Sequence, residues 1–169
     1  MRIFLIGFMG SGKTTIGRKL AAPIGFDFID ADHYIEQKSG LSVAQIFEQQ
    51  GEVAFRKIEH NALLELLQRD YVVISTGGGM PCYNNNIDLM LANGKVIYLK
   101  TSPQALTKRL MRSRTERPLI KDRSEAELRQ YIEERLTERE PVYNRAHISI
   151  QTENITTEEI LRTLHLMKK

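Results

Sequence analysis

One segment of the chain has the glycine spacing of a phosphate-binding loop. Residues 7–14 read Gly-Phe-Met-Gly-Ser-Gly-Lys-Thr, which matches the pattern G-x-x-x-x-G-K-[ST] in full. Such glycines let successive backbone N–H groups point at phosphate oxygens, and the start of the following helix adds the positive end of its dipole. Lys13 can then reach the β- and γ-phosphates, and the Thr14 hydroxyl can bind Mg²⁺. A glycine-rich turn that binds nothing is the alternative, but the position between an expected strand and an expected helix favours ATP or GTP binding.

Two carboxylates, Asp30 and Asp32, follow the second apolar run with one residue between them. They can hold the water shell of a metal ion, orient a hydroxyl group, or cap the helix expected at 33–38. Capping is a strong alternative for either residue taken alone. Their shared position at the end of a strand, beside a phosphate loop, favours a functional role.

Three consecutive glycines, 77–79, follow the third apolar run. A simple turn needs one or two glycines, and each glycine costs conformational entropy. A backbone without side chains lets a small ligand lie against its N–H groups, so we expect a ligand contact here. A tight turn before Pro81 is the alternative.

Arg56 and Glu59 form a further pair, three residues apart on an expected helix. At this spacing the carboxylate can hold the guanidinium in place. By itself such a pair would be a solvated surface ion pair of little consequence.

Short β-branched or aromatic runs alternate with longer helical patterns. The expected strands are Arg2–Ile6, Phe26–Ile29, Tyr71–Ser75, Lys95–Leu99 and His147–Ile150. The expected helices are 13–22, 33–38, 42–49, 52–69, 84–92, 103–112, 124–137 and 156–167. Ser42 with Gln45, and Ser124 before two acidic residues, mark two of the helix starts. This alternation predicts one α/β domain with a parallel sheet covered on both faces, whose ligands bind outside the carboxyl ends of the strands.

The charge is concentrated in one stretch. The net charge of the 169 residues is +3, and residues 105–123 hold seven basic and two acidic side chains, so the rest of the chain sums to −2. A nucleic-acid-binding protein usually spreads its basic residues over a face or a groove. A cluster in one segment suits a compact polyanion such as a nucleoside triphosphate.

Other features of the sequence limit where in the cell we expect the protein and which partners we expect it to have. No apolar run approaches the ~18 residues of a membrane span, and the apolar run that opens the chain stops at Gly7, too early for a secretory leader. The single cysteine, Cys82, excludes an internal disulfide framework and a multi-cysteine metal site. We therefore expect a cytoplasmic protein without a nucleic-acid or membrane partner.

Together these segments resemble the shikimate kinase family. The resemblance covers essentially the whole chain and rests on six segments in order: Gly7–Thr14, Asp30-Ala31-Asp32, Gly51-Glu52 with Phe55-Arg56 and Glu59, Thr76–Gly79, Arg117-Pro118-Leu119, and Glu138–Tyr143 with Arg139. It implies a three-layer α/β/α P-loop NTPase of the nucleoside-monophosphate-kinase type with a five-stranded parallel sheet. It also implies a single domain, 1–169, with a substrate-binding segment at about 31–60 and a mobile lid at about 110–124.

The resemblance further implies a reaction and a set of residues. The reaction transfers the γ-phosphoryl group of ATP to the 3-hydroxyl of shikimate, giving shikimate 3-phosphate and ADP, an early step toward aromatic amino acids, in a protein expected to be monomeric. Lys13, Asp32 and Arg117 are the expected catalytic residues, and Thr14 and Asp30 are expected to hold one Mg²⁺. The expected ATP contacts are Gly10, Ser11, Gly12, Lys13, Thr14, Thr15, Arg109 and Arg117. The expected shikimate contacts are Asp32, with the ring hydroxyls, Arg56 and Arg139, with the carboxylate, and the backbone of Gly78.

The sequence departs from the family pattern at one point. In the family an arginine upstream of the Arg-Pro-Leu segment packs on adenine, and here the spacing is one residue longer, which leaves Arg109 and Arg112 both as candidates. The adenine contacts near 152–155 are equally open. We expect Cys82 to be inert and none of the four histidines, His33, His60, His147 and His165, to be catalytic.

Two alternative functions come from the same phosphate loop. A nucleoside-monophosphate kinase would need base-reading residues in the acceptor pocket, whereas the triple glycine and paired arginines suit a small polyol that carries a carboxylate. A nucleotide-gated switch or an RNA-binding P-loop protein is the second alternative. The sequence has no [NT]-K-x-D guanine-reading motif, and aromatic residues do not interleave with the basic stretch as base stacking requires.

Overall fold

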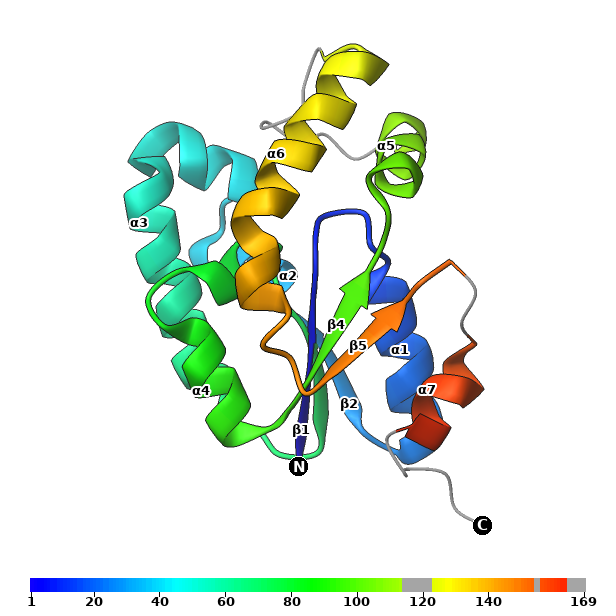
Figure 1. Cartoon of the computed structure of the whole chain (residues 1–169). Coiled ribbons are helices and arrows are strands. Elements are labelled where there is room, and N and C mark those ends of the chain that lie inside the picture. Colours follow the sequence, from blue (N-terminus) through cyan, green and yellow to red (C-terminus); the bar gives the residue numbers. More distant parts are fainter. Residues whose placement is uncertain (114–122, 154–155, 164–169) are drawn as a thin grey trace.

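The computed structural model describes residues 1–113, 123–153 and 156–163. Five strands form one parallel sheet in the order β2-β3-β1-β4-β5 (Figure 1). The strands are β1 (Arg2–Ile6), β2 (Asp27–Asp30), β3 (Val72–Ser75), β4 (Lys95–Lys100) and β5 (Ile148–Gln151). Each expected strand is present within one residue at either end, and the expected five-stranded parallel sheet is confirmed.

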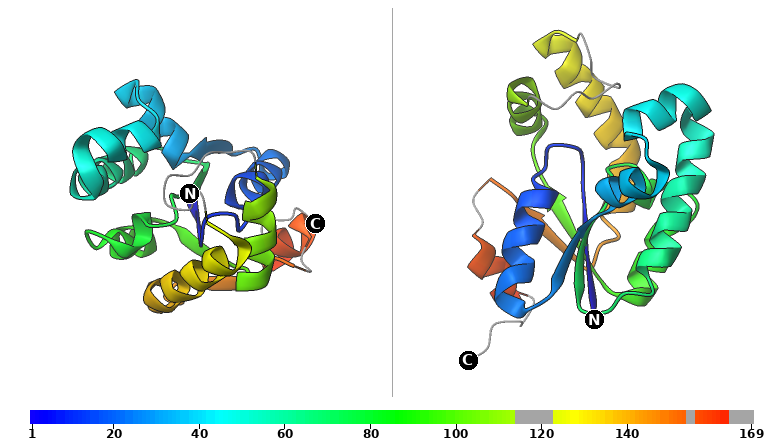
Figure 2. Two further views of the ribbon diagram at one scale, coloured as in Figure 1. Left: turned by 90° about the horizontal axis from the view of Figure 1, so that it is seen from above. Right: turned by 180° about the vertical axis from the view of Figure 1, so that it is seen from behind.

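Helices cover both faces of this sheet. They are α1 (Lys13–Ile24), α2 (Ala31–Ser39), α3 (Val43–Leu66), α4 (Asn86–Asn93), α5 (Pro103–Arg112), α6 (Glu125–Tyr143) and α7 (Thr157–Thr163), with a short 3₁₀ turn, η1 (Met80–Cys82). Helices α1 and α7 lie on one face, and α3, α4 and α6 lie on the other (Figures 1 and 2). The expected three-layer α/β/α arrangement is therefore present.

The buried residues of the central strand show how the layers are joined. Phe4 and Ile6 belong to the larger core, which packs under α3, α4 and α6. Ile3 and Leu5 belong to the smaller core under α1 and α7. All four side chains are fully buried, as expected of a parallel strand covered on both faces.

The helix starts agree with the sequence signals. Ser42 forms the expected capping box, and Ser124, expected only to precede an acidic first turn, forms one as well. In each box the serine hydroxyl accepts a hydrogen bond from the N3 amide, and the N3 side chain accepts one from the serine amide. The helices expected at 42–49 and 52–69 are the two parts of α3. They meet at Gly51, whose φ of +80° is outside the helical range and bends the chain there.

Several helix boundaries differ from the expectation. Helix α1 ends at Ile24 instead of residue 22, α3 ends at Leu66 instead of residue 69, and α4 begins at Asn86 instead of residue 84. Helix α2 begins at Ala31 instead of residue 33, because the Asp30 side chain caps it. Helix α6, expected to end at 137, continues to Tyr143, because Pro141 lies in its last turn and removes only one backbone hydrogen bond there. This extension places Arg139 on a helix. The end of the helix expected at 156–167 lies outside the described residues.

Nothing in the described part of the chain forms a helix long and apolar enough to cross a membrane. The described residues also hold no cluster of three or more histidine, cysteine, aspartate or glutamate side chains suited to a metal ion.

Candidate active site

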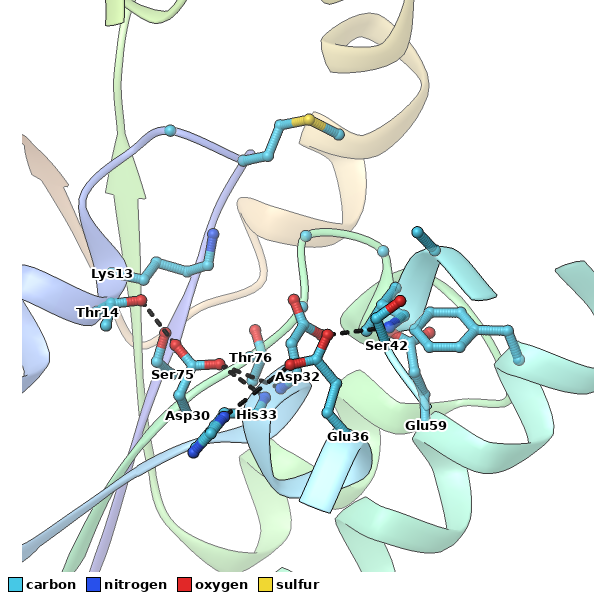
Figure 3. A pocket seen from close by; sticks show the side chains of 18 of the residues that line it. Lys13, Thr14, Asp30, Asp32, His33, Glu36, Ser42, Glu59, Ser75 and Thr76 are labelled. Atoms are coloured by element: carbon cyan, nitrogen blue, oxygen red, sulfur yellow. Dashed lines mark hydrogen bonds and ion pairs between the residues drawn. The ribbon is translucent and has the colours of Figure 1, made fainter. Parts of the chain in front are cut away.

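A cavity of about 850 Å³ lies at the carboxyl ends of β1, β2 and β3 (Figure 3). It brings together segments far apart in the sequence: the phosphate loop, the two aspartates, α3, the triple glycine and α6. The expected site residues that line it are Gly10, Gly12, Lys13, Thr14, Thr15, Asp30, Asp32, Arg56, Gly78 and Arg139. The cavity therefore joins the expected nucleotide and acceptor residues in one space.

The phosphate loop presents its backbone to this cavity. Gly12 caps α1 in the left-handed region, with φ +94°, and no side chain caps the helix. The first turn of α1 holds no acidic residue, which leaves the positive end of the helix dipole for an anion. The Lys13 ammonium group donates to the carbonyl oxygens of Gly7 and Phe8 at 2.8 and 2.9 Å, so it is held over the loop.

Asp30 links the phosphate loop to α2. Its Oδ2 accepts a hydrogen bond of 2.7 Å from the Thr14 hydroxyl, and its Oδ1 accepts from the amides of Asp32 and His33 at 3.2 and 3.3 Å (Figure 3). Asp30 thus caps α2 and also contacts the loop, so its role as a helix cap is confirmed and leaves its other oxygen bonded to Thr14. A hydroxyl and a carboxylate at hydrogen-bond distance are hard oxygen ligands of the kind that Mg²⁺ prefers, and the pair fits such an ion.

Arg56 lies on α3 between two glutamates. Its Nη1 donates to Glu59 Oε2 at 2.6 Å, and its Nε and Nη2 donate to Glu52 Oε1 at 3.2 and 2.8 Å. The guanidinium also lies 4.3 Å from the centre of the Tyr83 ring. Arg56 is 7% exposed and Glu59 1% exposed, so this pair is buried and differs from the solvated pair that spacing alone would describe.

Glu59 lines the part of the cavity that also holds Arg56, Arg139 and Asp32. Burial raises the pKa of its carboxyl to about 7, and the nearby Asp32 adds to the increase, whereas Arg56 and Arg139 oppose it. The two arginines therefore keep a deeply buried carboxylate close to ionisation at neutral pH.

The triple glycine makes room for these side chains. A Cβ on Gly79 would lie 2.5 Å from Arg56 Nη1, and a Cβ on Gly77 would lie 2.7 Å from both Asp32 Oδ1 and Glu59 Oε1. Packing against these charged side chains therefore explains the absence of side chains at Gly77 and Gly79.

Arg139 reaches the cavity from α6. Its guanidinium lies 5.6 Å from the centre of the Phe8 ring, and the residue is 8% exposed. An ideal Cβ on Gly78 would lie 3.7 Å from Arg139 Nη1. Two buried guanidinium groups, from α3 and α6, thus converge on the glycine segment.

A second cavity of about 1070 Å³ lies on the other side of the phosphate loop. It is lined by the loop, the start of α1, Arg109, Thr152 and α7 residues, with Ser11 and Thr15 among the loop residues. Arg109 Nη1 donates to the Gly10 carbonyl at 3.3 Å, whereas Arg112 is exposed and does not line this cavity. Of the two candidate arginines, the structure places Arg109 beside the nucleotide loop.

Several expected site residues lie outside the described residues. They are Arg117, most of the expected lid at about 110–124, residues 154–155 and His165. Sequence reasoning did not single out Glu36 and Phe47, which line the first cavity, although Glu36 follows Asp32 by one helical turn. Burial raises the pKa of the Cys82 thiol to about 11, which keeps it protonated at neutral pH.

The chain is similar to known proteins over most of its length. A model of the shikimate kinase family matches residues 9–167. A shikimate kinase of Parabacteroides distasonis is 48% identical over 157 residues, which cover 93% of this chain and 91% of that protein. The crystal structure of shikimate kinase from Bacteroides thetaiotaomicron matches with a TM-score of 0.94 at 35% identity and covers 98% of both chains.

Two further solved structures show how far this similarity extends. Shikimate kinase from Acinetobacter baumannii in complex with shikimate has a TM-score of 0.87 at 36% identity, over 97% of this chain and 90% of that chain. Deoxyadenosine kinase from M. mycoides has a TM-score of 0.60 at 18% identity, which shows a shared fold alone. Since the family model spans most of the sequence and the closely matching relatives cover nearly all of it, the chain belongs to the shikimate kinase family.

Proposed function

We propose that this protein transfers the γ-phosphoryl group of ATP to the 3-hydroxyl of shikimate, giving ADP and shikimate 3-phosphate. The observation that carries the proposal is the pair of buried guanidinium groups, Arg56 and Arg139, in the same cavity as the phosphate loop. Arginine forks suit a carboxylate, and two of them beside a phosphate loop suit a small acceptor that carries one.

The donor half of the cavity positions the nucleotide. Backbone amides of residues 10–15 cradle the phosphates, and Lys13 leaves the Gly7 and Phe8 carbonyls to neutralise charge on the transferring group. Thr14 and Asp30 would hold one Mg²⁺, which supplies charge stabilisation to the β- and γ-phosphates. Arg109 packs on the adenine side, in the second cavity.

The acceptor half positions the alcohol. Arg56, Arg139 and the backbone of Gly78 bind the carboxylate, and Asp32 accepts hydrogen bonds from the ring hydroxyls so that the 3-hydroxyl faces the γ-phosphate. Residues 31–60 act as the substrate-binding segment of a single domain. Arg117, in a lid at about 110–124, would reach the phosphates when ATP supplies the counter-charge, and closure would exclude water. We further propose a cytoplasmic monomer without a nucleic-acid or membrane partner.

ADP release tests this function. The purified protein with ATP and Mg²⁺ is given shikimate, gluconate, each nucleoside monophosphate, or RNA in separate reactions. We expect rapid ADP release with shikimate and background release with every other addition. Faster release with a nucleoside monophosphate would support the alternative kinase, and release stimulated by RNA would support the RNA-binding alternative.

A further inference from the structure

Tyr143 is a buried residue in the last turn of α6 that lies against the acceptor half of the cavity without lining it. Its side chain is fully buried, and its ring packs on the Tyr98 ring with 5.1 Å between the centres. Its hydroxyl donates a hydrogen bond of 2.5 Å to the carbonyl oxygen of Gly78. A helix on one side of the sheet thus holds the middle glycine of the triple-glycine segment.

This hydrogen bond fixes the orientation of a peptide group. The peptide between Gly78 and Gly79 is planar and trans, so its N–H points opposite to its C=O. Because the C=O points to Tyr143, the Gly79 N–H points away from Tyr143, and both Gly78 and Gly79 line the cavity. Glycine has access to many backbone conformations, so such a segment needs an external contact to keep one peptide orientation.

The same hydroxyl also lies near an expected substrate residue. The positive charge of the Arg139 guanidinium is close enough to Tyr143 to lower the pKa of its hydroxyl, against the effect of burial. The phenol therefore lies near one expected carboxylate-binding group and donates to the backbone of another. Burial raises the pKa of the Tyr143 hydroxyl well above its ordinary value, so the proton needed for the bond to Gly78 stays in place at neutral pH.

We propose that Tyr143 is a positioning residue for carboxylate recognition: its hydrogen bond to the Gly78 carbonyl holds the glycine segment in the geometry that binds the acceptor carboxylate beside Arg139. The inference rests on the proposed function and adds to it a specificity element that does not touch substrate. A preformed pair of donors binds a carboxylate more tightly than donors that must first be ordered.

Tyr143→Phe tests the proposal because it removes the hydroxyl and keeps the ring. We expect the shikimate KM to rise about tenfold, as for the loss of one hydrogen bond that orders a charged contact. The ATP KM and kcat stay within about twofold. Tyr98→Phe is the matched control, because it removes the other hydroxyl of the ring pair, which bonds Glu140 at 3.3 Å, and it should leave the shikimate KM unchanged.

An acceptor that lacks the carboxylate separates positioning from a general packing role. With the corresponding cyclohexene triol, Tyr143→Phe should change kcat/KM less than about twofold, whereas with shikimate it should lower kcat/KM about tenfold. Equal losses with both acceptors, or an unchanged shikimate KM, would overturn the proposal. Failure of the proposed function has a different signature, because the unmodified protein would then release no ADP in response to shikimate.

Discussion

The Thr14 hydroxyl donates a 2.7 Å hydrogen bond to Asp30 Oδ2, which joins the phosphate loop after β1 to the end of β2. The two residues are 16 positions apart, and the sheet order places β3 between their strands. The contact is therefore made above the sheet, between side chains at the carboxyl ends of two strands. It puts side by side a hydroxyl and a carboxylate, the two groups that we propose hold Mg²⁺.

Asp30→Asn separates the two roles of Asp30. Asparagine caps a helix as well as aspartate does, so α2 and the melting temperature should be preserved. The loss of charge should raise the Mg²⁺ concentration for half-maximal rate about tenfold, since hard cations prefer carboxylate oxygen. Rate measured against Mg²⁺ at saturating ATP checks this. An unchanged Mg²⁺ requirement would leave Asp30 as a helix cap only.

Arg109 and Arg112 provide a matched pair on α5. Arg109 lines the second cavity and contacts the Gly10 carbonyl, whereas Arg112 is exposed one turn further along. We expect Arg109→Ala to raise the ATP KM about tenfold, through the loss of a guanidinium stacked on the base. Arg112→Ala should change it less than about twofold. Steady-state kinetics with ATP varied compares the ATP KM of the two variants. A larger rise for Arg112→Ala than for Arg109→Ala would assign the adenine contact to Arg112 instead.

Gly79→Ala tests the close packing of the triple glycine. The new methyl group would lie 2.5 Å from Arg56 Nη1, so the guanidinium must shift. We expect the shikimate KM to rise about tenfold or more, since truncation or displacement of a buried charged partner costs about 2–5 kcal/mol.

A control variant separates this effect from lost stability. Gly25 has φ +69° and no atom within 4 Å of its Cβ position, so Gly25→Ala should cost about 1 kcal/mol of stability through backbone strain alone. Its shikimate KM should stay unchanged. If Gly25→Ala raised the KM as much as Gly79→Ala does, the effect would come from stability and the contact with Arg56 would be irrelevant.

Glu59 should give the protein a distinctive dependence of stability on pH. Its pKa is raised from 4.5 to about 7 in the folded state, so the folded state holds the proton more tightly than the unfolded state does. This contribution to stability is fully present below about pH 4.5 and is lost as the pH rises through about 7. Urea unfolding from pH 5 to pH 8 should show a greater loss of stability in the unmodified protein than in Glu59→Gln. Parallel curves for the two proteins would contradict the raised pKa.

Much of the fold was predictable because its signals are local. The apolar runs of the sheet, the serine caps of α3 and α6 and the break at Gly51 each depend on a few neighbouring residues. The end of α6 was not predictable in this way, because Tyr143 is held there by contacts with Tyr98 and Gly78, far away in the sequence. Tertiary packing overrides local propensity at such positions.

The site residues also divide into those with a local sequence signal and those that depend on tertiary packing. The phosphate loop is a contiguous motif, so its residues can be read from the sequence directly. The burial of Glu59 and the approach of Arg56 to Gly79 depend on how α3 packs over the sheet, and no spacing along the chain encodes that distance. The choice between Arg109 and Arg112 likewise required the position of α5 relative to the loop.

The most direct test of phosphoryl transfer to the 3-hydroxyl of shikimate is to identify which atom of the product carries the phosphate. The purified protein is incubated with ATP, Mg²⁺ and shikimate, and the product is examined by phosphorus NMR with coupling to the ring protons. We expect one phosphate ester whose phosphorus couples to the proton at carbon 3, formed in a 1:1 ratio with ADP. Free phosphate as the only product, or an ester at another hydroxyl, would contradict it.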